Sequence, residues 1–189
     1  MTRYQLKICS FIKLLLFLFS ANTVFAQAVD GVVSQRQFEI NARADQALQE
    51  LFDTNSNAVE LFENAAGYAA FSATKGGFFV TVGGGTGVLV DKASDSRTYM
   101  RMGTGGIGIG AGIQTFNLVI IFENQFILDA FKSGGWDSSA TAQAAAGQAG
   151  ISVGSSFVDG IAIYQLTDKG LMAVADVAST RFWVADNLN

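Results

Sequence analysis

The sequence has 189 residues, half of them hydrophobic, with 12 basic and 16 acidic side chains, no histidine, no proline and one cysteine. Without histidine the chain cannot build the Ser-His or Cys-His pairs of the common hydrolases, and zinc sites of the Cys/His kind are excluded as well. The acidic balance also argues against nucleic acid as a partner, because such binding neutralises phosphates with basic side chains.

Residues 1–28 are predicted to form a cleaved secretory signal. Basic residues at the start are followed by the apolar run FIKLLLFLF at 11–19, and small residues then allow cleavage after Ala26 or Ala28. The run is short for a membrane span. Cleavage would remove Cys9 and three of the basic residues, leaving 9 basic against 16 acidic side chains, a net charge of −7. We therefore expect an exported protein, periplasmic or secreted, or peripheral to a membrane, with residues 29–189 as a single domain.

Two helices are predicted at the start of this domain. Residues 34–53 carry apolar side chains at helical spacing, and Ser34 with Gln37 fits a capping box. After a break, residues 57–66 repeat the helical pattern. The two helices are interpreted as a lid on a sheet or as an amphipathic element that contacts a membrane, and their acidic polar face favours the lid.

From Gly67 onward the sequence consists mainly of short strands separated by turn signals, which is typical of an antiparallel sheet. One further helix is predicted near 123–134, where apolar residues return to helical spacing. The predicted fold class is therefore α+β and mainly antiparallel β, as a sandwich or barrel-like sheet, with two N-terminal helices and this inserted one.

Two glycine-rich stretches lie within the predicted strands, at 75–92 and 103–112. The second contains G-x-G-x-x-G, but it continues as IGIGAGIQ, which alternates at period two and does not open a helix as a dinucleotide site requires. The glycines at 106, 108, 110 and 112 are predicted to share one face of a strand. Such a face suits a closely packed layer or, alternatively, a hydrophobic ligand.

The candidate binding residues are basic and aromatic. Arg97, Tyr99 and Arg101 alternate along one predicted strand and so share a face, where two guanidinium groups and a phenol could hold a phosphate or a lipid headgroup. Lys75 and Lys92 lie in neighbouring strand-end segments and complete the set. The alternative is a solvated outer face with ordinary ion pairs. If the arginines bind an anionic lipid, replacing both with Ala should weaken vesicle binding roughly ten- to thirtyfold.

Nothing in the sequence singles out a catalytic or metal-binding group. The aspartates at 91, 95, 159 and 168 lie at apparent turns, where such residues commonly bond to the backbone. We therefore expect no enzymatic activity, no metal and no cofactor.

Four segments in this order resemble the SYLF domain: 65–92, 103–124, 125–136 and 168–177. This lipid-binding domain is found in yeast actin-patch proteins, in their animal relatives and in many exported bacterial proteins. The resemblance implies binding of phosphoinositides or other anionic lipids, a relationship to the actin-binding domain of the yeast proteins, and no enzymatic activity.

The leading hypothesis is a non-enzymatic lipid-binding module of the cell envelope, with a lipid or a membrane surface as its partner. The sequence names no protein partner. The alternative from another class is a structural or assembly protein of the envelope that acts through protein contacts at strand edges. A small outer-membrane barrel and an enzyme fit the sequence less well.

Overall fold

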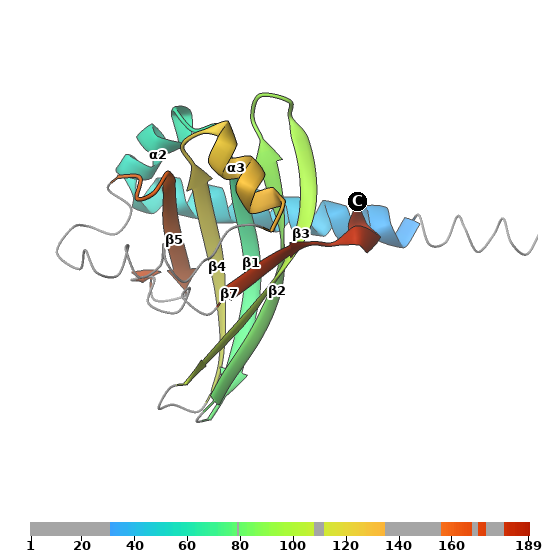
Figure 1. Ribbon diagram of the computed structural model, residues 1–189. Coiled ribbons are helices and arrows are strands. Elements are labelled where there is room, and N and C mark those ends of the chain that lie inside the picture. The colour runs from blue at the N-terminus through green and yellow to red at the C-terminus, as the bar shows by residue number, and fades with distance from the viewer. Residues whose placement is uncertain (1–30, 79, 108–111, 135–155, 168–169, 173–179) are drawn as a thin grey trace, which may run out of the picture. The chain divides into compact units, whose positions relative to one another are not determined.

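The computed structural model describes residues 31–78, 80–107, 112–134, 156–167, 170–172 and 180–189. The described strands form one seven-stranded antiparallel sheet in the order β6-β5-β4-β1-β2-β3-β7 (Figure 1). The predicted α+β class with mainly antiparallel strands is confirmed. The sheet formed by these residues is open, and helices rather than a second sheet cover its two faces.

The strands are β1 (Gly67–Gly77), β2 (Val80–Asp91), β3 (Ser96–Ile107), β4 (Gly112–Phe122), β5 (Ile161–Thr167), β6 (Gly170–Met172) and β7 (Thr180–Val184). The helices are residues 31–54, α2 (Ser56–Glu63), α3 (Gln125–Lys132) and the short 3-10 helix η2 (Asp186–Leu188). The chain divides into two compact units between Phe38 and Glu39, and the packing and the site described below belong to the second unit.

The predicted helices are all present, with different ends. Residues 31–33 are already helical, so Ser34 does not begin the first helix and the predicted capping box there is wrong. Asn55 lies within the predicted break at 53–57 and caps α2, its side chain accepting a hydrogen bond from the Ala58 amide at 3.1 Å. Asn124 caps α3 in the same way through the Ile127 amide, also at 3.1 Å.

One face of the sheet, which we call the helix face, is covered by the first helix and α2. Ile40, Ala44, Leu48 and Leu51 recur at helical spacing and are buried against this face. The sheet side chains that they cover include Tyr68, Ala70, Val88, Val119, Ile121 and Tyr164. From Glu39 to residue 54 the first helix is therefore a lid, as its acidic outer side predicted.

The opposite face, the α3 face, holds a cluster of aromatic rings. Phe131 of α3 lies 5.0 Å from Phe122 and 5.0 Å from Phe182, measured between ring centroids. Phe71 lies 4.9 Å from Phe182 and 6.5 Å from Phe131. These rings come from β1, β4, β7 and α3, so the cluster joins segments far apart in the sequence.

Three glycines of β2 make room for side chains of β1 on the α3 face. A Cβ atom added at Gly85 would lie 2.6 Å from the Ala73 Cβ, and one at Gly83 would lie 2.7 Å from the Lys75 Cβ. At Gly87 the added atom would meet the ring of Phe71. The GGGTG stretch is thus part of a β-strand, and the side chains of β1 occupy the space that side chains at its glycines would fill. It is not a phosphate-binding loop.

The second glycine-rich stretch is shared between two strands. Gly106 belongs to the end of β3 and Gly112 to the start of β4, so the predicted single strand face through 106, 108, 110 and 112 is wrong. Glycine occupies every second position from 106 to 112, so the sequence pattern does not show where one strand ends and the next begins. Residues 108–111 lie outside the described part of the chain.

Tyr164 gives the fold a predictable response to alkali. Its side chain is fully buried, and burial raises the pKa of its hydroxyl from the ordinary 10.0 to about 12. An unfolded tyrosine loses its proton near pH 10, so stability should fall as pH rises from 10 to 12, by about 3 kcal/mol. Tyr164→Phe lacks this ionisation and should lose correspondingly less over the same range. Urea unfolding of both proteins at several pH values measures the difference, and parallel pH profiles would contradict it.

Candidate functional site

Arg97, Tyr99 and Arg101 lie together on the helix face of β3, as their alternation predicted. Tyr99 is buried, and its hydroxyl accepts a hydrogen bond from the Asn41 side-chain amide at 3.0 Å. The Asn41 carbonyl oxygen accepts a bond from Arg97 Nη1 at 2.8 Å. One asparagine of the first helix therefore links the phenol to the guanidinium, and Tyr99 anchors the helix to the sheet.

Arg101 is tied to the C-terminal residues instead. Its Nη2 donates to the Asn187 side-chain oxygen at 2.9 Å, while its Nε is buried without a hydrogen-bond partner in the described part of the chain. The Asn189 side chain accepts from the Tyr99 amide at 2.8 Å and donates to the Tyr99 carbonyl at 2.9 Å. These bonds fix η2 beside β3. Arg97 stays exposed to solvent, whereas Arg101 is only partly exposed.

The two lysines do not converge with the arginines. Lys92 Nζ donates to the carbonyls of Phe62 at 2.7 Å and Glu63 at 3.1 Å, and lies 4.8 Å from the centroid of the Phe62 ring. It thus stabilises the C-terminal end of α2, where helix carbonyls attract positive charge. Lys75 lies on the α3 face, 5.6 Å from the Phe116 ring centroid.

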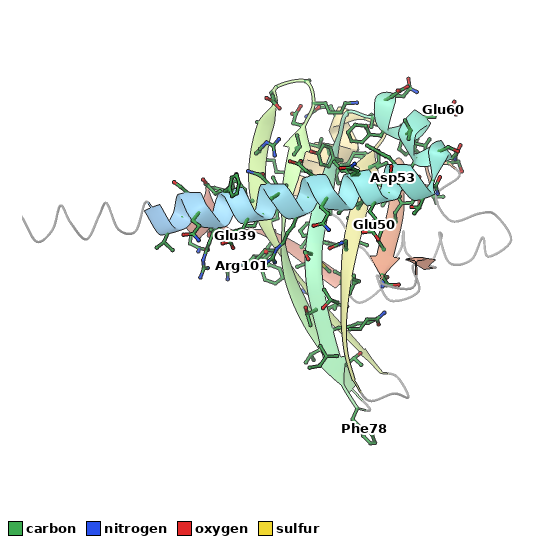
Figure 2. All side chains as sticks on the ribbon, turned by 180° about the vertical axis from the view of Figure 1, so that it is seen from behind. Glu39, Glu50, Asp53, Glu60, Phe78 and Arg101 are labelled. Carbon is green, nitrogen blue, oxygen red and sulfur yellow. The ribbon has the colours of Figure 1, made fainter. Side chains whose placement is uncertain are left out.

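Charge is distributed very unevenly over the sheet. Residues 68–90 and 97–122, which include most of β1 to β4, contain no Asp or Glu, and their only charged residues are Lys75, Arg97 and Arg101. Among the described residues, the acidic side chains lie in the helices and near the strand ends that hold Asp91 and Glu123. Figure 2 shows Glu39, Glu50, Asp53 and Glu60 along the helices, with Phe78 far from them at the end of the strands.

The acidic turn residues serve the fold. Asp91 is the last residue of β2. Its Oδ1 accepts hydrogen bonds from the amides of Ala93 at 2.9 Å and Ser94 at 3.2 Å, while Gln125 donates to Oδ2 at 3.0 Å. The bond from Ser94 is the main reason that the pKa of this carboxyl is lowered. Asp95 and Asp159 adopt positive φ angles at their turns.

The strand ends farthest from the helices expose apolar side chains that the sequence reasoning missed. Val82 and Ile113 both pair with Gly76 and are 67% and 84% exposed, and Phe78, just beyond β1, is 62% exposed. We call Gly76, Phe78, Val82 and Ile113 the sheet tip. The absence of acidic residues from both flanking stretches was the available signal, since it is visible in the sequence alone.

The described residues contain neither a metal-binding cluster nor a membrane-spanning helix. No group of three or more acidic or cysteine side chains among them could hold a metal ion. Within the same residues, no helix combines the length and the apolar character needed to cross a membrane.

One curated protein is similar to this chain over most of its length. Beta cell expansion factor A from Aeromonas veronii is 32% identical over 154 residues, which are 82% of this chain and 59% of that protein. The chain therefore spans about three-fifths of the length of this relative. No family model matches the chain.

Proposed function

We propose that the protein is a non-enzymatic lipid-binding module of the cell envelope, related to the SYLF domain and recruited to anionic membranes. The observation that carries the proposal is the pair of acid-free stretches, 68–90 and 97–122, which contain the exposed apolar side chains Phe78, Val82 and Ile113. The similarity of the four segments to the SYLF domain supports the same function, because that domain binds lipids.

The charge distribution explains how an acidic protein could bind an anionic surface. A net charge of −7 after cleavage at the predicted site would repel such a surface as a whole. Screening limits that repulsion to a Debye length of about 8 Å in physiological salt. Among the described residues at the sheet tip there is no acidic side chain, so this end can approach the membrane while the acidic helices stay outside this range.

A second candidate function is assembly with a protein partner through a sheet edge. β3 has 12 residues but pairs with β7 over only Met100 to Thr104. Within the described residues, both ends of β3 thus lack a strand partner on that side. Strand addition at such an edge is a common mode of protein recognition.

Vesicle co-sedimentation of the exported protein tests the proposed function. We expect binding to phosphatidylcholine vesicles that contain phosphatidylglycerol, weaker binding to phosphatidylcholine alone, and a decrease as salt is raised, since exposed charges are screened. Protein that stays in the supernatant with both vesicle types, at low salt, would contradict the proposal and favour assembly through a sheet edge.

A further inference from the structure

We propose that the sheet tip is the membrane contact, and that it inserts end-on into the headgroup region of an anionic phospholipid bilayer. This inference rests on the proposed function and names the surface and the orientation that carry it. The occupant is the lipid interface, reached by Phe78, Val82 and Ile113, with Lys75 at the level of the headgroups.

The apolar side chains at the tip are gathered and not scattered. Val82 and Ile113 flank Gly76 on the helix face, and Phe78 follows two residues later. Gly76 between them leaves both neighbours exposed, and the Ile113 Cγ1 would lie only 3.5 Å from a Cβ added there. A Phe beside β-branched residues, in a stretch that contains no acidic residue, is the composition that interfacial insertion favours.

Strand geometry sets the depth of insertion. A strand advances about 3.3 Å per residue, so the level of Gly76, Val82 and Ile113 lies about 7 Å behind Phe78. Lys75 lies about 10 Å behind Phe78 on the same scale. Interfacial elements bury their apolar side by about 5–10 Å. Insertion to the level of Ile113 therefore brings the Lys75 ammonium group, which lies 5.6 Å from the Phe116 ring centroid, to the headgroups.

The same scale separates this orientation from docking by the arginine face. Arg101 is level with Thr86 and Ser72, about 20 Å behind Phe78, and Arg97 is level with Tyr68, about 33 Å behind it. Both distances exceed the insertion depth plus a Debye length of about 8 Å. In the end-on orientation the two arginines should therefore contribute little to binding.

The acidic end of the sheet is on the opposite side. Asp91 is level with Gly67, eleven residues from Phe78 and so about 36 Å away along the strand. Glu123 follows β4 at this same end. Repulsion between these carboxylates and an anionic surface would turn the acidic end outward, which presents the tip.

A fluorescent probe at the tip tests the insertion directly. The sequence has one cysteine, so Cys9→Ser permits single-site labelling of Phe78→Cys with an environment-sensitive NBD group. Phe126→Cys is the matched control, because Phe126 is 79% exposed on α3. On phosphatidylglycerol-containing vesicles we expect a blue shift and shallow quenching by spin-labelled lipid at position 78 and neither at 126. Equal responses at both positions would overturn the inference.

Binding of unlabelled variants separates the end-on from the arginine-face orientation. Phe78→Ser should weaken vesicle binding about tenfold, Phe126→Ser less than twofold, and Arg97→Ala with Arg101→Ala also less than twofold. Circular dichroism confirms that each variant is folded. A ten- to thirtyfold loss in the arginine variant, with Phe78→Ser unchanged, would overturn end-on insertion and leave lipid binding standing.

Two other outcomes also decide against the inference. A wild-type protein that binds neither vesicle type would overturn both the insertion and the proposed function. A blue shift of the probe at position 78 that grows with protein concentration in the absence of vesicles would assign the sheet tip to contact with a second copy.

Discussion

Gly85→Val should lower the free energy of unfolding by about 3 kcal/mol, because it overfills the space between β2 and β1. Even the first added carbon would lie 2.6 Å from the Ala73 Cβ and 2.8 Å from the Ala73 Cα. The Ala73 backbone is held in the ladder with both β2 and β4. It therefore cannot retreat without breaking strand pairing.

The neighbouring glycine provides the control. A Cβ added at Gly84 would point to the helix face, with only the Met102 carbonyl oxygen near it, at 3.4 Å. We expect Gly84→Val to change stability by less than about 1 kcal/mol, since strand propensity favours Val and no atom is displaced. Urea unfolding of the two variants measures both effects. Equal losses of stability in the two variants would show that the side chains of β1 do not fill the space beside the glycines of β2.

Phe131→Ala should cost about 3–5 kcal/mol, the second large effect that the structure predicts. Phe131 is 1% exposed, and its ring contacts the rings of Phe122 and Phe182. Truncation would leave a cavity between α3 and the sheet, which the remaining rings cannot fill without leaving their own positions. A fall in the urea midpoint with an unchanged denaturant slope is the expected result.

Phe126→Ala on the same helix is the comparison. Its ring is 79% exposed, so we expect a change within about 0.5 kcal/mol. If both variants of α3 were equally destabilised, burial of the Phe131 ring would not explain the loss. If neither were, α3 would not contribute to the stability of the sheet.

Local patterns predicted most of the fold. Helical spacing located the first helix, α2 and α3, since each buries one apolar side. The prediction of strands from Gly67 onward is confirmed, but the prediction that they are short is wrong for β1 to β4, which have 11 or 12 residues each. The connection between β3 and β4 could not be predicted, because glycine alternates with isoleucine or alanine throughout it. A pattern of period two contains no information on where a strand reverses when no proline, asparagine or charged residue marks the turn.

The candidate site was predicted only in part. The shared face of Arg97, Tyr99 and Arg101 follows from strand periodicity alone, and the structure has it. Their bonds to Asn41 and Asn187 could not be predicted, because they join residues 56 and 86 positions apart. Lys75 was grouped with them because of its charge. It lies an odd number of residues from Tyr68 and Ala70, which face the helices, so its own side chain lies on the α3 face.

The contacts between β3 and residues 180–189 have a consequence for the order in which the sheet can form during synthesis. β7 pairs with β3, and Asn189 bonds to Tyr99, 90 residues earlier in the chain. The aromatic cluster on the α3 face likewise cannot form completely until Phe182 has been synthesised. A chain emerging from the ribosome cannot form either contact until residues 180–189 have been synthesised, so the β3–β7 pairing and the aromatic cluster must remain incomplete until then.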